Sequence, residues 1–462
     1  MPGVNCMIAR PVPNKENSLD WMTGKARAYI ALQTRILPHT RALETSFGGR
    51  VMTVTLDYPG YGITSIESGD WTLCLECQPQ GANIHQITRE LDEADLSHPD
   101  EAGLRNLWSR AFSHLKGAWF CLAVNPRLKL LVFANDALAR LPVYLSKTEA
   151  GLFVGRDIGL ARALCPSARP NPLYLALYQI FCYVPGRGGC FDEVDTLKGA
   201  TIAVYDWNND ELRVSDRPEL RFGEPLGHGT KTKRLGELVD AFLEVVEGYR
   251  TEDKVCLALS GGFDSRTVVA ALSRARINYQ TLTYQDADRT ATDDCLIAGQ
   301  IAQALGCQHK QLTLRPESPD LYHKLFAVKQ GMNYLGMSFF MDFLQRLAGG
   351  VESPGLMLTG DGGDKVFPCL KAEAELPDAR SFLKHLYGQQ AFFHPRIAAA
   401  SFGLKQQAID AYLLDLVKGY PGSSYAAKYK WFLLAERSGR YLTEGEDRNR
   451  SFIRSETPFL DP

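Results

Sequence analysis

The run from Ser260 to Arg266, Ser-Gly-Gly-Phe-Asp-Ser-Arg, combines glycines, hydroxyls and a carboxylate within seven residues. Two consecutive glycines let the backbone turn tightly and bring its N–H groups close to an anion. Ser260 and Ser265 add hydroxyl donors for phosphate oxygens, and Asp264 is a hard oxygen ligand suited to Mg²⁺. The alternative is a turn that only connects a strand to a helix. The residue types favour a phosphate-binding loop that works with magnesium.

A second polar run, Leu358 to Phe367, reads Leu-Thr-Gly-Asp-Gly-Gly-Asp-Lys-Val-Phe. Its Asp364 follows Asp264 by 100 residues and could approach the same Mg²⁺ from the opposite wall. The metal would stabilise the charge that develops on a leaving pyrophosphate. The alternative role for Asp361 or Asp364 is to cap a helix.

The elements around these runs alternate between strand and helix. Apolar residues at helical spacing precede a strand at Val255 to Leu259, and a helix at Arg266 to Ala275 follows the loop. A strand at Tyr279 to Tyr284 and a helix from Thr292 to Leu305 come next. This order predicts a parallel sheet with helices on both faces. Beyond Pro368 the chain is expected to be mainly helical.

The first part of the chain has a different pattern. From Arg50 to about Asp206, short apolar strands alternate with Gly, Pro and Asn turns, which is typical of packed antiparallel sheets. A stretch rich in Pro, Gly and charge then marks a linker. We therefore expect an N-terminal domain at residues 1–214, a linker at 215–232 and a second domain at 233–462, with an α/β fold class overall.

Composition excludes several classes of protein. The 462 residues carry a net charge of −2, so neither a nucleic-acid partner nor a membrane surface is indicated. No apolar run is long enough to span a membrane, and the first residues lack a signal-peptide core, so we expect a cytoplasmic protein. An odd number of cysteines, 11, scattered along the chain favours reduced thiols.

The segment Leu257 to Ser265 resembles the S-G-G-x-D-S pyrophosphate loop of N-type ATP pyrophosphatases. Three further segments are similar to the asparagine synthetase family. Asp294 to Gly306 resembles its helix ending in A-x-x-L-G, Leu358 to Phe367 its S-G-E-G-S-D-E-L-F motif, and Glu456 to Asp461 its E-a-R-v-P-F-L-D segment. The resemblance implies a parallel α/β synthetase domain with helical additions, which uses ATP and Mg²⁺ and cleaves ATP to AMP and pyrophosphate.

The same resemblance implies roles for individual residues. Mg²⁺ would be bound by Asp264 and Asp364, and the catalytic set would be Asp361, Asp364 and Lys365. Asp361 replaces the family's glutamate and could accept a proton from an attacking ammonium. Lys365 occupies a place that is usually acidic, where it could weaken metal binding or contact a phosphate. The nucleotide-binding positions would be Leu259, Ser260, Gly261, Gly262, Asp264, Ser265, Thr283 and Gly360, with Leu259 and Thr283 beside the adenine.

The N-terminal domain resembles the family's glutaminase domain in Asn135 to Tyr144 and Phe153 to Ile158. This resemblance implies a degenerate Ntn-hydrolase-like αββα sandwich. The family's nucleophile is a cysteine exposed at the N-terminus after removal of Met, but position 2 here is Pro2. Cys6 is internal, so its amide nitrogen cannot act as a free α-amino base. These departures argue against glutamine hydrolysis, and the domain would serve as a scaffold or a recognition surface.

This chain resembles two branches of the family that need no glutaminase. In both branches the amine and the activated carboxylate belong to one molecule. The two branches are the lasso-peptide macrolactam synthetases and the β-lactam synthetases. Arg266 after the loop and the Gly362-Gly363-Asp364 run favour the macrolactam branch. Its partners would be a peptide or small carboxylate substrate and a leader-peptide-binding or processing protein. Closure of a β-lactam, another natural-product amide synthetase and an asparagine synthetase that uses free ammonia stay open.

Family members continue for roughly a hundred residues beyond the P-F-L-D segment, as the resemblance implies, and include a lysine that stabilises the transition state. The second domain is therefore expected to be truncated. An alternative of another class is a catalytically inactive subunit that binds nucleotide or peptide as a partner.

Overall fold

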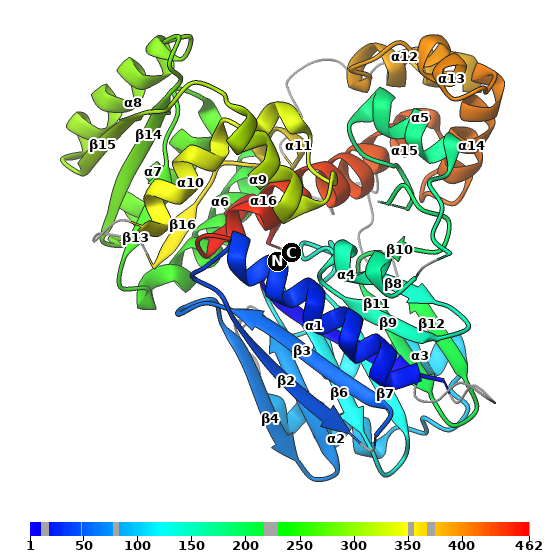
Figure 1. Ribbon diagram of the computed structural model, residues 1–462. Coiled ribbons are helices and arrows are strands. Elements are labelled where there is room, and N and C mark those ends of the chain that lie inside the picture. Colours follow the sequence, from blue (N-terminus) through cyan, green and yellow to red (C-terminus); the bar gives the residue numbers. More distant parts are fainter. Residues whose placement is uncertain are drawn as a thin grey trace. The chain divides into compact units, whose positions relative to one another are not determined.

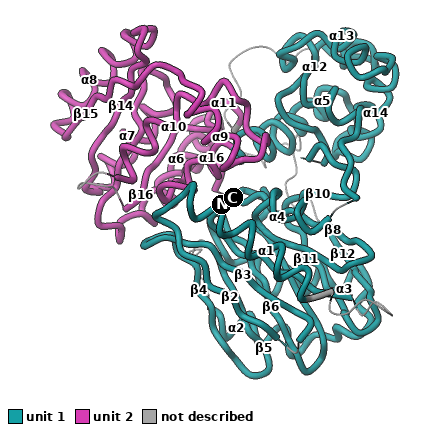
Figure 2. The backbone as a smooth tube through the Cα atoms, in the orientation of Figure 1, with its two compact units in different colours: residues 1–222, 374–444, 462 teal, residues 223–373, 445–461 magenta. Residues whose placement is uncertain are grey.

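The computed structural model describes residues 1–10, 18–47, 49–76, 83–165, 167–187, 189–216, 230–349, 355–366 and 375–461. The chain divides into two compact units (Figure 2). Unit 1 comprises residues 1–222, 374–444 and 462, and unit 2 comprises residues 223–373 and 445–461. Both units are therefore discontinuous in sequence.

Among its described residues, unit 1 contains two six-stranded antiparallel sheets (Figure 1). The first sheet has the order β10-β8-β9-β1-β3-β2, with β1 Gly3–Ala9, β2 Arg41–Phe47, β3 Val51–Asp57, β8 Tyr144–Lys147, β9 Gly151–Gly155 and β10 Asp195–Thr196. The second has the order β12-β11-β7-β6-β5-β4, with β4 Ile63–Ser68, β5 Trp71–Glu76, β6 Phe120–Asn125, β7 Leu130–Asn135, β11 Thr201–Asp206 and β12 Glu211–Asp216.

Both faces of the second sheet are covered, which explains why its central strands are apolar throughout. In β7, Leu131 and Phe133 belong to a core shared with β1 and β9 of the first sheet. The alternate residues Val132 and Ala134 pack instead with α2 (Ile84–Glu93) and α3 (Glu101–Phe112). Successive strand residues point to opposite faces, so a strand between two apolar layers needs no polar positions.

Helices α1 (Ser18–Ile36) and α4 (Ile158–Ala163) contact the first sheet, and α1 lies across that sheet in Figure 1. With α2 and α3 on the second sheet, the layers are helix, sheet, sheet and helix. This is the αββα sandwich that we predicted.

The rest of unit 1 is helical. It contains α5 (Pro172–Phe181), α12 (Ala379–Gln390), α13 (Pro395–Ser401), α14 (Gln406–Lys418) and α15 (Tyr425–Phe432), followed by a π-helix at Leu433–Leu442. One apolar core joins α5 to these later helices. Residues 374–444 therefore pack with the N-terminal part of the chain, whereas we assigned the whole of 233–462 to the second domain.

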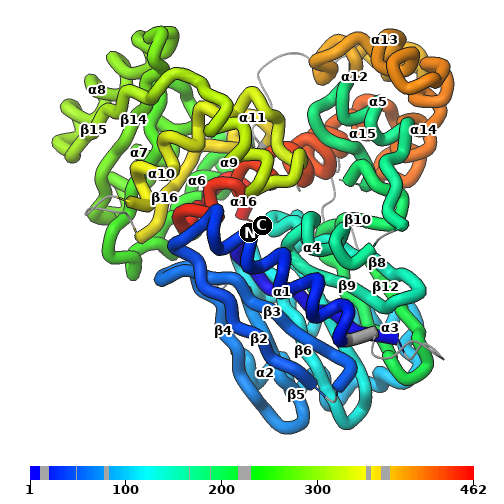
Figure 3. The backbone as a smooth tube through the Cα atoms, viewed as in Figure 1, coloured from blue at the N-terminus to red at the C-terminus, as the bar shows by residue number. Residues whose placement is uncertain are grey.

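Unit 2 is built on a parallel sheet with the order β15-β14-β13-β16-β17. Its strands are β13 Val255–Ala258, β14 Tyr279–Gln285, β15 Gln308–Thr313, β16 Leu356–Leu358 and β17 Ser455–Glu456. Its helices are α6 Lys231–Glu247, α7 Phe263–Arg274, α8 Thr292–Leu305, α9 Pro319–Lys329, α10 Phe340–Gly349, α11 Gly363–Val366 and α16 Thr443–Arg450, of which α16 begins within unit 1. Short 3₁₀ turns lie at Gly248–Thr251, Leu335–Met337 and Pro458–Leu460. The segment 445–461, red in Figure 3, returns to pair with β16.

Helices cover both faces of this sheet, as predicted. Val255 and Leu257 of β13 share a core with α6 and α7. The register pairs Leu257 with Thr281, so Tyr284 of β14 points to the opposite face. There its ring contacts Phe340 and Phe343 of α10.

Predicted boundaries differ by a few residues. The helix after the phosphate loop begins at Phe263 and not at Arg266, because Gly262 already serves as its N-cap. The apolar run from Leu128 to Phe133 does not form a strand over its whole length: β7 begins at Leu130, because Lys129 has φ 59° in the hairpin turn. Of the predicted linker, residues 215–216 belong to β12 and residues 231–232 belong to α6. Residues 217–229 lie outside the described part of the chain.

No helix in the described ranges combines the length and the apolar character that crossing a membrane requires. All nine cysteines within those ranges are free thiols.

A fully buried ion pair links strands of the two sheets in the sandwich. Arg156 Nε donates to Glu76 Oε1 at 2.9 Å, and both side chains have no exposed surface. Glu76 also accepts from the Tyr61 hydroxyl at 2.5 Å and from the Val4 N–H at 3.1 Å. All of these donors share the Glu76 carboxylate, so its removal would deprive several buried polar groups of an acceptor.

We therefore expect Glu76→Ala to lower the free energy of unfolding of unit 1 by about 3 to 5 kcal/mol, because the buried guanidinium of Arg156 loses its carboxylate partner. Glu76→Gln keeps the shape and two of the acceptor contacts, and its loss should be smaller. Urea denaturation followed by circular dichroism measures both variants. Equal stability of Glu76→Ala and the unchanged protein would contradict this account.

Candidate nucleotide-binding site

The predicted phosphate loop lies where β13 ends and α7 begins. Because β13 and β16 run parallel and in register, their carboxyl ends meet at one edge of the sheet. The loop after β13 carries Asp264, and the loop after β16 carries Asp361 and Asp364. The fold thus brings two segments a hundred residues apart to the same edge.

Hydrogen bonds between its two serines fix the shape of the loop. The Ser265 hydroxyl accepts from the Ser260 N–H at 3.1 Å and donates to the Ser260 carbonyl at 3.1 Å. The Ser260 hydroxyl accepts from the Gly262 N–H at 3.2 Å and lies 3.1 Å from the Ser265 hydroxyl. The serines therefore brace the turn itself, in addition to any contact with a phosphate.

The two loops touch at glycines. A Cβ at Gly360 would lie 2.7 Å from the Ser265 nitrogen, and one at Gly363 would lie 2.6 Å from Asp264 Cγ. Side-chain atoms do not fit at such distances, so both positions require glycine. This close approach is what sets Asp264 beside Asp364.

The charges of Asp264, Asp364 and Lys365 are coupled. Burial raises the pKa of Asp264, and the nearby Asp364 raises it further. The Asp364 N–H and the Lys365 ammonium act in the opposite direction on the pKa of Asp264. Lys365 Nζ also pairs with the Asp364 carboxylate, whose side chain is 55% exposed. The carboxylate of Asp264 and the adjacent carboxylate of Asp364 suit a divalent cation, and Lys365 partly offsets their charge.

Asp361 is held at the same edge by its backbone. Its carbonyl accepts from the Thr457 hydroxyl at 2.6 Å, and its N–H donates to the Thr359 hydroxyl at 3.4 Å. Although the side chain reaches solvent, the protein around it raises the pKa of Asp361 by desolvation, and Asp364 and Asp264 add to the rise. Arg448 and Thr359 act to lower the pKa of Asp361.

The predicted adenine positions are both buried and bonded to one another. Thr283 Oγ1 donates to the Leu259 carbonyl at 2.5 Å, and the Leu259 N–H donates to the Leu282 carbonyl at 2.9 Å. Leu259 directly follows β13, but Thr283 lies within β14 and not at its end. Leu259 and Thr283 therefore lie side by side near this edge, one just after β13 and the other in the neighbouring strand β14.

Two residues at this edge were not predicted. The Asp294 carboxylate accepts from the Gly261 N–H at 2.8 Å, a donor that we assigned to phosphate. Arg448 is buried, lies 4.6 Å above the Phe340 ring and influences the pKa of Asp361. In sequence, Asp294 is an acidic residue in the first turn of a helix, and that position is usually explained by the helix dipole.

The residues from 237 to 447 match the family model described as asparagine synthase. This region, called the asparagine synthase domain below, is similar to that family. The match supports the asparagine synthetase family and ATP-dependent amide ligation as its general chemistry. The matched residues include β13, the phosphate loop and β16, so both aspartate loops lie within them, whereas Arg448 and Thr457 follow them.

Solved structures similar to this chain are known at low identity. A glutamine phosphoribosylpyrophosphate amidotransferase from B. subtilis, complexed with ADP and GMP, is 10% identical, with 68% of this chain and 91% of that chain covered and a TM-score of 0.28. An NMN synthetase from Francisella tularensis is 15% identical, with 46% and 95% covered and a TM-score of 0.24. An NH₃-dependent NAD synthetase from Campylobacter jejuni, in complex with the nitrate ion, is 12% identical, with 46% and 96% covered and a TM-score of 0.23.

A search of the curated proteins found no match.

Outside the asparagine synthase domain, Cys6 is the thiol nearest the position of the family's glutaminase nucleophile. It lies in the middle of β1, paired with Thr53 on one side and Val154 on the other. Burial raises the pKa of Cys6 far above its usual range, so the reactive thiolate does not form. The structure supports the expectation that this cysteine is not a nucleophile.

We expect Gly363→Ala in the asparagine synthase domain to abolish nucleotide binding, because the added methyl group would overlap Asp264 and push the loops apart. Gly299→Ala is the matched control, since the same addition in α8 meets nothing within 4 Å. Calorimetric titration with Mg²⁺ and α,β-methylene ATP compares the two. Wild-type affinity in Gly363→Ala would show that the close approach is not needed.

The raised pKa of Asp264 predicts that Mg²⁺-dependent nucleotide binding varies with pH. A metal binds the carboxylate form, so raising the pKa makes Mg²⁺-dependent nucleotide binding weaken at a higher pH than for an ordinary aspartate, whose pKa is about 3.9. Lys365→Met removes a charge that lowers the pKa of Asp264, so the midpoint of this loss should move to higher pH. Affinities measured from about pH 8 down to about pH 5, each normalised to the high-pH value, test this. Lys254→Met, which alters an exposed lysine outside the site, should leave the midpoint unchanged.

Proposed function

We propose that this protein is an AMP-forming amide ligase that activates a substrate carboxylate as its adenylate and closes a macrolactam, as lasso-peptide synthetases do. The observation that carries the proposal is the pairing of Asp264 with Asp364 beside the Ser-Gly-Gly-Phe-Asp-Ser loop, inside an asparagine synthase domain.

The residues at this edge fit ATP and Mg²⁺. Helix α7 starts at the loop, and its first N–H groups and the positive end of its dipole favour a phosphate. Mg²⁺ is commonly bound by one or two carboxylates together with phosphate oxygens and water, so Asp264 and Asp364 would hold it. When bound, Mg²⁺ would offset the negative charge that develops on the leaving pyrophosphate.

The proposed reaction has two steps. In the first, a carboxylate oxygen of the substrate bonds to the α-phosphorus of ATP, and the bond from that phosphorus to the α,β-bridging oxygen breaks, so pyrophosphate leaves. In the second, the nitrogen of a substrate amine bonds to the acyl carbon, and the bond from that carbon to the adenylate oxygen breaks, so AMP leaves. The amine loses one proton in the second step, and a base must accept it.

Asp361 is the candidate for that base. Its pKa is raised, which makes the carboxylate a stronger proton acceptor than an ordinary aspartate. Thr457 and Thr359 hold the Asp361 backbone, so the point from which the short side chain extends is fixed. Arg448 nearby acts to lower the pKa of Asp361, because it favours the charged form.

An intramolecular amine is supported by two features. Cys6 is buried within a sheet, so ammonia from glutamine is not expected from unit 1. Tyr284 lies within electrostatic influence of Asp361 and Arg448 and packs against the α10 phenylalanines, which gives one side of the site an aromatic wall. Such a wall suits the side chains of a folded peptide.

The proposed function is tested with linear peptides that carry a free N-terminal amine and an internal Asp or Glu. The expected products are AMP, pyrophosphate and a peptide whose mass is lower by one water. The same peptide with an acetylated N-terminus should yield no cyclic product. Release of ADP and phosphate in place of AMP and pyrophosphate would contradict the mechanism, and acceptance of small β-amino acids alone would favour β-lactam closure.

Asp264→Ala should weaken binding of α,β-methylene ATP with Mg²⁺ by about tenfold or more, because a charge-assisted contact is worth about 1.5 to 3 kcal/mol. Asp288→Ala, at an exposed aspartate outside the loop, is the control. Calorimetry measures both. Absence of nucleotide binding by the unaltered chain would favour the alternative of an inactive partner subunit.

A further inference from the structure

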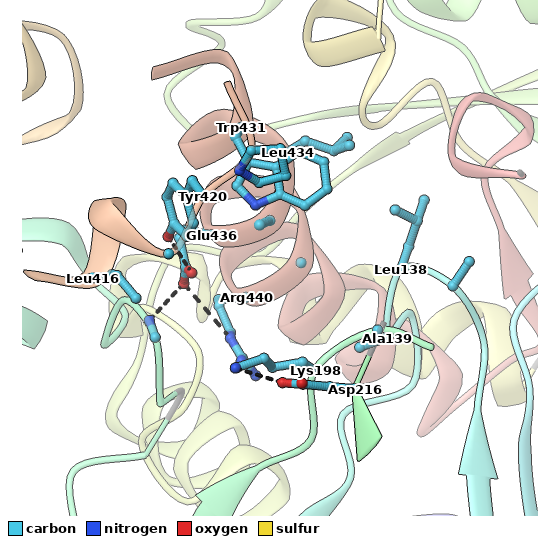
Figure 4. A pocket seen from close by; sticks show the side chains of 17 residues that line it. Leu138, Ala139, Lys198, Asp216, Leu416, Tyr420, Trp431, Leu434, Glu436 and Arg440 are labelled. Atoms are coloured by element: carbon cyan, nitrogen blue, oxygen red, sulfur yellow. Dashed lines mark hydrogen bonds and ion pairs between the residues drawn. The ribbon is translucent and has the colours of Figure 1, made fainter. Parts of the chain in front are cut away.

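Unit 1 contains a cavity of about 250 Å³ that the proposed function does not use. One side is formed by the sandwich and the other by α14, α15 and the π-helix (Figure 4). Its lining includes Leu138, Lys198, Leu416, Trp431, Glu436 and Arg440. The volume is large enough for a free amino acid.

One end of the cavity carries two opposite charges. Glu436 and Arg440 are both buried, with 4% and 6% of their surface exposed. The Glu436 carboxylate accepts from the Gly186 N–H at 2.7 Å and from the Tyr420 hydroxyl at 2.6 Å (Figure 4). Each carboxylate oxygen can accept two hydrogen bonds, so Glu436 retains capacity for another donor.

The guanidinium of Arg440 is incompletely satisfied. One of its terminal nitrogens donates to the Leu197 carbonyl at 3.4 Å. Its Nε is buried and has no hydrogen-bond acceptor among the described residues. The nearest Glu436 oxygen lies 3.8 Å from Nε, which is an ion-pair distance and not a hydrogen bond. Buried polar atoms are nearly always hydrogen-bonded, so the guanidinium of Arg440, which lines the cavity, retains unused donor capacity.

The charged residues belong to a π-helix, Leu433–Leu442. Its wider turn is visible at the end of the helix, where the Thr443 N–H donates to the Ser438 carbonyl, five residues earlier. Short π segments within helices occur frequently at functional sites. This backbone geometry is a second observation, independent of the unpaired Nε, that favours a site.

The opposite end of the cavity is apolar. Trp431, Leu434, Leu416 and Leu138 line it, and Trp431 packs edge-on against the Tyr420 ring. At the rim, Lys198 pairs with Asp216 at 2.6 Å, and both side chains are largely exposed. The cavity thus combines a buried carboxylate and guanidinium at one end with an aromatic and aliphatic wall.

We propose that this cavity binds a free α-amino acid with an apolar side chain. The ligand carboxylate would accept from the Arg440 guanidinium, and its ammonium would donate to Glu436. The pair of opposite charges matches a zwitterion, whereas a simple acid or a simple amine would engage only one of them. The apolar side chain would occupy the wall formed by Trp431 and the leucines. This inference does not depend on the proposed ligase activity.

The test is calorimetric titration of the full chain with L-leucine, 4-methylpentanoate and isopentylamine, which share one apolar group but differ in charge. Titration to about 10 mM saturates a site whose Kd is near 1 mM. We expect L-leucine to bind and each singly charged analogue to bind at least tenfold more weakly. L-alanine, L-valine and L-phenylalanine extend the series and report how much of the apolar wall is used.

Gly439→Leu is designed to fill the cavity, because Gly439 lines it and its nearest atoms lie 3.6 Å from an added Cβ. It should abolish binding of leucine. Gly388→Leu, in α12 with nothing within 4 Å of the added Cβ, is the matched control and should bind as the unaltered chain does. Leu138→Trp is a second variant, which blocks the cavity from the sandwich side. It tests the same expectation if Gly439→Leu does not fold.

Asp264→Ala separates this site from the nucleotide site, and it should bind leucine with unchanged affinity. The proposal is overturned if none of the apolar amino acids binds, if the analogues bind as well as leucine, or if the folded cavity-filling variants retain binding. Glu436 and Arg440 would then be a structural ion pair only.

Discussion

The candidate site depends on one steric constraint. Two loops approach each other so closely that only glycine, whose side chain is a hydrogen atom, fits at the contact. Gly360 and Gly363 pass so close to Asp264 and Ser265 that any side chain there would overlap them. The parallel pairing of β13 with β16 brings the loops to one edge, and the glycines close the remaining gap. The coupled charges of the aspartates, and the influence of Lys365 on them, follow from this contact.

Sequence alone predicted the local parts of this arrangement because they depend on local chemistry. The phosphate loop, the alternation of strands and helices and the apolar central strands of the sandwich follow from glycine content and periodicity. Ser260, Asp264, Ser265 and Asp364 were identifiable from residue type. Their assignment to nucleotide and metal remains a prediction, now supported by the loops' proximity.

Other features could not be predicted, since they arise from contacts between distant segments. Nothing in the residues around Asp294 indicates that its carboxylate accepts from the Gly261 N–H. The packing of residues 374–444 with α5 depends on complementary apolar faces, whereas the sequence shows only that these helices are amphipathic. The cavity beside Arg440 is likewise formed by segments more than two hundred residues apart.

The return of the segment 445–461 to unit 2 has a consequence for biosynthesis. Strand β17 completes the sheet beside β16, and Thr457 holds the Asp361 carbonyl. Chains are made from the N-terminus, so residues 223–373 leave the ribosome with that sheet position unfilled, and they wait while residues 374–444 are translated. A nascent chain interrupted in this interval carries both aspartate loops without the hydroxyl that anchors one of them. Assembly of the site is therefore a late event of translation.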